Sequence, residues 1–215
     1  MIKRLVAFGD SWTYGQGIEK DIHYKEYRYP NDFINNLRRS NSWVRWLADK
    51  YQIPFVNLSS PGICNPQIKN ILKENIPFLN KEEDLILIML SFPYRHHLWE
   101  ETVPPFDMPV GNIVFTINEL LEGYNYYILN SFYPTFNDEP ELKNELDLSR
   151  FLEVDKTAAD VLITYENLYN ISVWEYGIRN VKNKENFDTG SYHPNLLGYQ
   201  VIADWIFNIL NSEKN

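Results

Sequence analysis

The chain has 215 residues, of which 44% are hydrophobic and 23% are charged, values that are ordinary for a soluble globular protein and suit a single domain over residues 1–215. Its net charge of −9 repels phosphate backbones, which excludes the basic surface of a typical nucleic-acid-binding protein. The single cysteine, Cys64, excludes an intramolecular disulfide, and no apolar run is long enough for a signal-peptide core or a membrane span.

Short apolar runs alternate with helix-like stretches, a pattern typical of a parallel sheet covered by helices on both faces. The run at residues 84–90 is continuously apolar after its first residue, as expected for a central strand buried on both sides. The pattern predicts an α/β fold, a three-layer α/β/α sandwich with a five-stranded parallel sheet, for which we expect the flavodoxin-like strand order 2-1-3-4-5. The predicted strands cover residues 4–8, 54–58, 85–91, 127–132 and 171–176.

The predicted helices are recognised by their first residues and by their apolar spacing. Ser42 can cap one helix, and Asn65 with Pro66 forms an N-cap and N1 pair for the next. The last helix follows His193 and carries an apolar residue at every fourth position, namely Leu197, Val201, Trp205 and Ile209. Weaker helical patterns cover residues 112–121 and 156–167, and the proline-containing segments 99–109 and 133–148 are predicted to be surface loops.

A Gly9-Asp10-Ser11 triplet follows the first predicted strand directly. A serine there is presented on a tight turn near the start of a helical segment, where its own N–H can point into the site and the local dipole favours a developing negative charge. The alternative is that Asp10 or Ser11 is an ordinary helix cap, and the triplet alone does not decide between the two. His193 offers a base with a pKa near neutrality, which a serine needs to become a nucleophile.

These residues resemble the SGNH (GDSL-type) hydrolases, whose first block is a Gly-Asp-Ser after strand one. The resemblance extends from Gly9 to Gly198. It implies that Ser11 is the nucleophile and His193 the general base. In the family, a glycine after the second strand contributes its N–H to the oxyanion hole, and Gly62 stands in that place. Asn65 can reach the same hole, although its role as a helix cap would also explain it.

The sequence departs from the family in its third block, which is normally Gly-x-Asn-Asp. Here the third strand is followed by a segment without asparagine, so Ser91, Arg95, one of the histidines or Asn65 would have to supply the missing oxyanion donor. The neighbouring His96 and His97 do not indicate a metal site, because adjacent side chains rarely point at one ion. We therefore expect no metal and no cofactor.

The last block also departs from the family, in which an aspartate three residues before the histidine orients it. Gly190 occupies that position, and Asp188 is the nearby aspartate. Asp188 would complete a triad if the loop brings it to the imidazole. Otherwise the site would operate as a Ser11–His193 dyad, with a backbone carbonyl or a water fixing the ring.

Taken together, the resemblance implies a serine esterase that removes an acetyl or short acyl group from a carbohydrate or small molecule. The alternatives are an inactive module of the same fold that binds a glycan or a protein partner, and a structural or assembly role. We expect no nucleic-acid or membrane partner and a cytoplasmic location, and the composition would suit a phage or a low-GC bacterial genome. The sequence does not indicate an oligomeric state.

Overall fold

The computed structural model describes residues 1–18, 31–91, 110–131, 136, 140–163, 193–194 and 196–212. Its centre is a parallel sheet with the strand order β2-β1-β3-β4. The strands are β1 (Arg4–Gly9), β2 (Phe55–Asn57), β3 (Asp84–Leu90) and β4 (Asn125–Asn130). The parallel α/β architecture and the order of the first four strands are therefore as predicted, whereas the predicted fifth strand at residues 171–176 lies outside the described residues.

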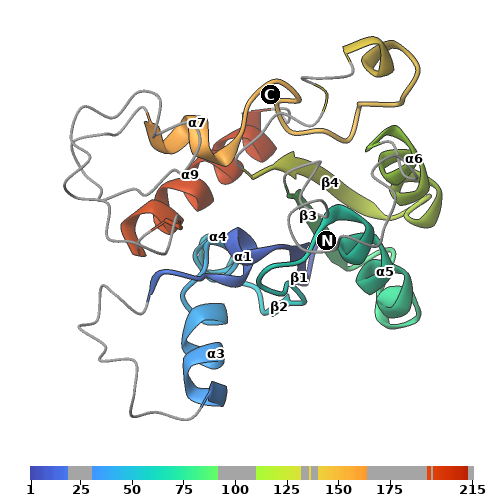
Figure 1. Cartoon of the computed structure of the whole chain (residues 1–215). Helices are drawn as coiled ribbons and strands as arrows, with labels where there is room; N and C mark the ends of the chain where they lie inside the picture. Colours follow the sequence, from blue (N-terminus) through green and yellow to red (C-terminus); the bar gives the residue numbers. More distant parts are fainter. Residues whose placement is uncertain are drawn as a thin grey trace.

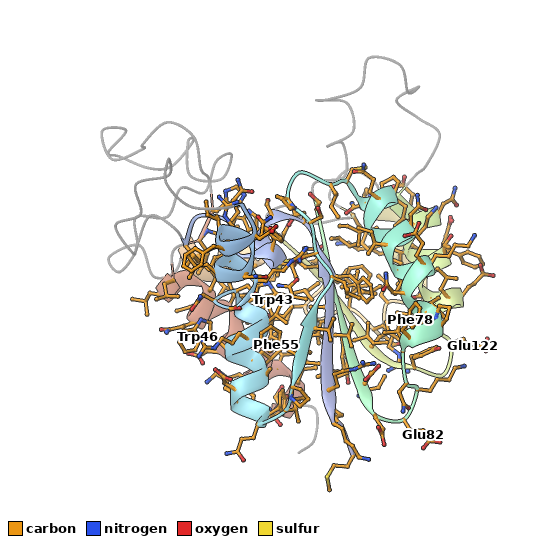
Figure 2. All side chains as sticks on the ribbon, turned by 90° about the horizontal axis from the view of Figure 1, so that it is seen from below. Trp43, Trp46, Phe55, Phe78, Glu82 and Glu122 are labelled. Carbon is orange, nitrogen blue, oxygen red and sulfur yellow. The ribbon has the colours of Figure 1, made fainter. Side chains whose placement is uncertain are left out.

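Helices cover both faces of this sheet, which Figure 2 shows as two helical layers on either side of the strands. One layer contains α4 (Trp43–Tyr51), α7 (Ala158–Ile163) and α9 (Leu196–Ser212), and the other contains α5 (Asn65–Asn75) and α6 (Val110–Leu120). The shorter elements are α1 (Ser11–Tyr14), α3 (Asn31–Arg39), η1 (Ile76–Phe78) and η3 (Pro140–Asn144). Figure 1 gives their arrangement along the chain.

The core forms because alternate residues of the strands face opposite helical layers. Leu85 and Leu87 of β3 pack in the cluster that contains Trp43 of α4, whereas Ile86 and Ile88 pack with Ile68 of α5. Every residue of β3 is buried, as its continuously apolar sequence predicted. Figure 2 labels Trp43 and Trp46 on α4. It also labels Glu82 and Glu122, which lie near the amino ends of β3 and β4.

Two helix predictions are corrected. The N-cap of α5 is Cys64 rather than Asn65, so Asn65 is the first helical residue, and the Cys64 N–H donates a 2.9 Å hydrogen bond to Gln67 Oε1. In α9 the predicted apolar series is only partly buried, because Trp205 belongs to the core and Val201 and Ile209 pack against it, whereas Leu197 is 43% exposed. The helix is apolar on more than one side, and the face turned to the core is defined by Tyr199, Ile202, Ala203, Ile206 and Leu210.

The outer edge of β4 is partly occupied by the chain at residues 150–157. Ile128 accepts a 2.8 Å backbone hydrogen bond from Leu152, and donates one of 2.7 Å to Arg150. A second isolated bridge joins Asn130 to Thr157. Segment 133–148, predicted to be a loop, contains the short helix η3. No helix within the described residues is long and apolar enough to cross a membrane.

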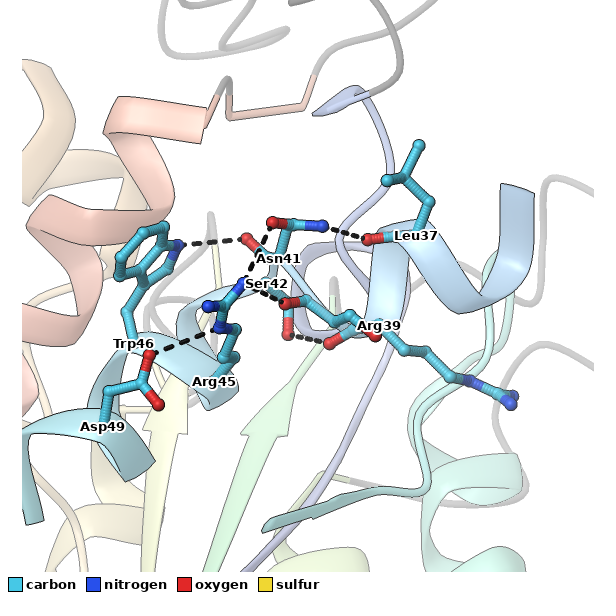
Figure 3. Close-up of polar contacts among 8 residues, drawn as sticks. Leu37, Arg39, Asn41, Ser42, Arg45, Trp46 and Asp49 are labelled. Carbon is cyan, nitrogen blue, oxygen red and sulfur yellow. Dashed lines mark hydrogen bonds and ion pairs between the residues drawn. The ribbon is translucent and has the colours of Figure 1, made fainter. Parts of the chain in front are cut away.

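The junction between α3 and α4 is built from hydrogen bonds that close the turn, drawn in Figure 3. Asn41 Nδ2 donates to the Leu37 carbonyl at 2.7 Å, and Trp46 Nε1 donates to the Asn41 carbonyl at 3.2 Å. Ser42 is the N-cap of α4, as predicted, but its hydroxyl donates to the Arg39 carbonyl instead of capping the helix. The junction thereby holds the start of α4 close to the end of α3.

Candidate functional site

The turn after β1 carries the predicted nucleophile. Asp10 is the N-cap of α1, and its Oδ1 accepts a 3.0 Å hydrogen bond from the Trp12 N–H. Ser11 is the first residue of the helix, so its N–H has no partner within α1. Gly15 ends the helix with a φ of 92°, and a Cβ there would lie 2.2 Å from the Arg38 carbonyl oxygen. The turn is therefore tight, and α3 packs directly against it.

Gly62 lies in a turn between β2 and α5, with a φ of 80° that favours glycine. It is exposed, and a Cβ at this position would meet no atom within 4 Å. In the part of the chain that the structure describes, no hydrogen bond engages the N–H of Gly62 or of Ser11. The two residues differ in exposure, since Gly62 is exposed and Ser11 is 2% exposed.

A chain of buried polar side chains crosses the carboxyl ends of β1 and β3. The Ser91 hydroxyl donates a 2.7 Å hydrogen bond to Asp10 Oδ2. Asn65 Oδ1 accepts from the Ser91 N–H at 2.7 Å, and Asn65 Nδ2 donates to the Ser91 carbonyl at 3.1 Å. Asp10, Asn65 and Ser91 are 0%, 1% and 1% exposed. The structure thus brings two of the predicted oxyanion residues, Asn65 and Ser91, together with the aspartate that precedes Ser11.

Asn57 is a supporting residue that the sequence patterns did not indicate. Its Nδ2 donates to the Thr13 carbonyl at 2.8 Å and to Ser42 Oγ at 3.1 Å. Its Oδ1 accepts from the Ser59 N–H at 3.2 Å, and also from the Ser59 hydroxyl. The last residue of β2 therefore ties α1 to the start of α4. The only sequence signal was a polar residue at the carboxyl end of an apolar strand, which is common in α/β proteins.

His193 precedes α9, and its Nδ1 is shielded from solvent. No hydrogen bond joins it to Ser11 among the described residues. Their elements are joined instead through Tyr199, in the first turn of α9, whose hydroxyl donates a 2.9 Å hydrogen bond to the Gln16 carbonyl. The Gln16 N–H in turn donates to the Ser11 carbonyl at 3.2 Å. Residues from the two ends of the chain thus meet beside the turn that carries Ser11.

Several predicted residues lie outside the described part of the chain. They are Arg95, His96, His97, Asp188 and Gly190. Within the described residues, no group of three His, Cys, Asp or Glu side chains is arranged to hold a metal ion.

No family model matches the sequence, and no curated protein matches it. Solved structures do resemble it. A protein assigned to the G-D-S-L family from Desulfitobacterium hafniense superposes with a TM-score of 0.56 at 16% identity, over 96% of this chain and 99% of that chain. A carbohydrate esterase gives 0.59 at 13% identity, over 99% and 69% of the two chains. A variant of Axe2, an acetyl xylan esterase from Geobacillus stearothermophilus, gives 0.55 at 14% identity, over 97% and 94%.

At these identities the likeness is one of fold. The chain has the SGNH hydrolase fold that G-D-S-L-family proteins share, as the Gly-Asp-Ser block and the parallel sheet predicted. In this fold β1 lies between β2 and β3, and its carboxyl end is the point where the strand order reverses. Ligands of open α/β sheets bind at that point, and it is where Ser11 stands.

Proposed function

We propose that the chain is a carboxylic ester hydrolase that forms an acyl-enzyme on Ser11, with His193 as the general base. The observation that carries the proposal is the hydrogen bond from Tyr199 to the Gln16 carbonyl, since it anchors the helix behind His193 to the turn that bears Ser11. The fold shared with esterases supports the reaction class, and the position of Ser11 at the switch point of the sheet supports its role.

In the proposed reaction the Ser11 oxygen attacks the ester carbonyl while His193 takes the hydroxyl proton. The carbonyl oxygen becomes negatively charged, and the N–H groups of Ser11 and Gly62 stabilise it together with the N-terminus of α1. The C–O bond to the alcohol then breaks, and His193 returns its proton to the departing oxygen. A water molecule, deprotonated by His193, hydrolyses the acyl-enzyme and regenerates Ser11. Asp188 is the proposed third member that orients His193.

We propose an acetyl or short acyl group on a carbohydrate or small molecule as the substrate. The support is that one solved structure of similar fold is described as an acetyl xylan esterase and another as a carbohydrate esterase. The same fold also accommodates lipolytic proteins. The acyl group is therefore to be identified by comparing the rates of hydrolysis of esters that differ in the length of their acyl group.

The reaction is tested by hydrolysis of p-nitrophenyl acetate and by labelling with a fluorophosphonate, followed by mass-spectrometric mapping of the modified residue. We expect the label on Ser11, and a loss of kcat of about 10³-fold or more in both Ser11→Ala and His193→Ala. The matched control is Ser131→Ala at the end of β4. The Ser131 hydroxyl is buried and has no hydrogen-bond partner in the described part of the chain, so its removal should leave both readouts unchanged. Full activity in Ser11→Ala would overturn the proposal.

A second candidate is a glycan-binding module without catalysis. The observation in its favour is that Ser11 and His193 are not hydrogen-bonded to each other among the described residues, although catalytic hydrogen bonds are often long in structures without substrate. A wild-type protein that binds acetylated xylo-oligosaccharides but shows neither labelling nor hydrolysis would favour this second function.

A further inference from the structure

The side chain of Asn65 pairs with the backbone of Ser91 in the way that a neighbouring strand would. Its carbonyl oxygen accepts from the Ser91 N–H and its amide nitrogen donates to the Ser91 carbonyl, at 2.7 and 3.1 Å. The two bonds define which atom of the amide is oxygen and which is nitrogen, and they leave the side chain one orientation. Because both residues are almost fully buried, these bonds fix the end of β3 to the start of α5.

Ser91 passes this constraint to Asp10. A hydroxyl has one hydrogen to donate, and that of Ser91 goes to Asp10 Oδ2 at 2.7 Å. The other oxygen of Asp10 accepts from the Trp12 N–H at 3.0 Å. Asp10 is therefore held from two sides, and it is the residue immediately before Ser11. A carboxylate fixed in this way constrains the first turn of α1, which begins at Ser11.

We propose that Asn65 is a positioning residue for Ser11, acting through Ser91 and Asp10, and that the Ser91 hydroxyl serves this chain of contacts rather than a substrate. The proposal rests on the proposed function of Ser11 as a nucleophile. It assigns a role to Ser91, which stands at the position of the third block, and to Asn65, which was a candidate for the oxyanion donor that this block lacks. The Ser11 and Gly62 N–H groups remain the donors to the substrate oxygen.

The physical reason for expecting an effect on rate is the geometric tolerance of acyl transfer. A nucleophile must approach the carbonyl carbon to about 3–3.5 Å along a defined direction, and a displacement of about 1 Å can cost roughly 10²-fold in rate. Loss of the Asn65 amide would free the end of β3, and Ser91 would no longer hold Asp10 in place. We expect the substitution to leave the hydrophobic clusters on both faces of the sheet unchanged.

The test is the rate constant for fluorophosphonate labelling of Ser11, measured at a temperature at which circular dichroism shows each variant fully folded. We expect Asn65→Ala to label about tenfold or more slowly and Ser91→Ala to show a loss of similar size. The double variant should be little slower than Asn65→Ala, since the two side chains act along one path. Asn65→Asp keeps the shape and the acceptor but loses the donor to the Ser91 carbonyl, and it serves if the alanine variant does not fold.

The matched control is Asn130→Ala. Asn130 is also a buried asparagine at the carboxyl edge of the sheet, and its Nδ2 donates to the Val154 carbonyl at 2.9 Å, away from β1. We expect it to lower the melting temperature and to leave the labelling rate unchanged. If a folded Asn65→Ala or Asn65→Asp labels as fast as wild type, Asn65 is a structural residue only and the proposal is wrong.

A second measurement separates this proposal from the proposed function. The Trp12 N–H donates to Asp10, so its hydrogen exchange reports on the turn whether or not the protein is an enzyme. We expect faster Trp12 exchange in Asn65→Ala than in wild type, and no change in Asn130→Ala. Unlabelled wild-type protein would overturn the catalytic role of Ser11, whereas unchanged Trp12 exchange in Asn65→Ala would overturn the positioning by Asn65.

Discussion

At the scale of single residues, the turn after β1 depends on glycine for two separate reasons. Gly15 has a φ of 92°, a conformation that L-residues rarely adopt, and its backbone approaches the Arg38 carbonyl so closely that a Cβ would lie 2.2 Å from the oxygen. Gly123 shares the first requirement, with a φ of 78°, but a Cβ there would make only ordinary contacts with the Lys81 side chain. The two glycines therefore separate backbone strain from steric overlap.

Gly15→Ala is expected to destabilise the protein by about 3 kcal/mol or more, because about 1–2 kcal/mol of left-handed strain is added to about 1–3 kcal/mol of overpacking. Gly123→Ala should cost only the strain, about 1 kcal/mol. Urea unfolding with a shared m-value measures both. If both variants lost the same free energy of unfolding, the overlap with the Arg38 carbonyl would contribute nothing, and the prediction would be wrong.

The single residues of the site differ in how far the sequence predicted them. Ser11 and His193 stand in motifs with characteristic neighbouring residues, so the resemblance was enough to propose them as candidates. Asn57 and Asp10 act through partners 44 and 81 residues away, namely the Thr13 carbonyl and the Ser91 hydroxyl. A sequence pattern describes the spacing of nearby residues, and it does not indicate which side chains form hydrogen bonds with residues far along the chain. The assignment of Asn65 as a helix cap failed for this reason, since its amide is committed to Ser91.

At the scale of elements, the pairing of β1 with β3 begins with two consecutive ion pairs that differ in burial. Lys3 pairs with Glu83 at 2.5 Å, and their side chains are 64% and 39% exposed. Arg4 binds Asp84 through two nitrogens, at 2.8 and 2.5 Å, and the Asp84 side chain is 2% exposed. The hydrogen bond to Asp84 raises the pKa of Arg4 above its usual value. The pairs thus offer an internal comparison of an exposed and a shielded interaction.

Arg4→Met is expected to lower the free energy of unfolding by about 2–3 kcal/mol, because it keeps most of the apolar stem and leaves a buried carboxylate without its cation. The loss should lie below that of a fully buried pair, since the Arg4 side chain is itself 34% exposed. Lys3→Met is the control and should cost less than about 1 kcal/mol. The measurement is again urea unfolding. A Lys3→Met variant as unstable as Arg4→Met would contradict the assignment of the energy to burial.

Elements with one dominant pattern were predicted well, and those that depend on a neighbour were not. β3 is apolar throughout and is central, as expected. α9 is apolar around much of its circumference, so spacing alone did not select the buried side, and Leu197 faces solvent. The contact of residues 150–157 with the edge of β4 has no sequence signal at all, because it consists of backbone hydrogen bonds at isolated positions.

At the scale of the whole molecule, elements from the two ends of the chain pack in one helical layer and meet beside the turn that carries Ser11. Figure 1 shows α9, from the C-terminal part of the chain, beside α4 and α1, from its first quarter. Two tyrosines join α9 to this N-terminal region through their hydroxyl groups. Tyr199 donates to the Gln16 carbonyl at the start of α9, and Tyr51 accepts a 3.2 Å hydrogen bond from Asn211 Nδ2 near its end. The two contacts are twelve residues apart, or about 18 Å along the helix.

Tyr199→Phe and Tyr51→Phe each remove one hydroxyl and one hydrogen bond, so each should lower the free energy of unfolding by about 0.5–1.5 kcal/mol. Their effects on the proposed chemistry should differ. Tyr199 anchors the turn of Ser11 to the helix that follows His193, and its loss is expected to slow fluorophosphonate labelling of Ser11 by about tenfold, since small displacements of the base are costly. Tyr51→Phe should label at the wild-type rate. Labelling rates measured on fully folded samples, alongside urea unfolding, separate the two effects. Equal labelling in both variants would contradict the expectation that the Tyr199 hydroxyl holds α9 in place for the reaction at Ser11.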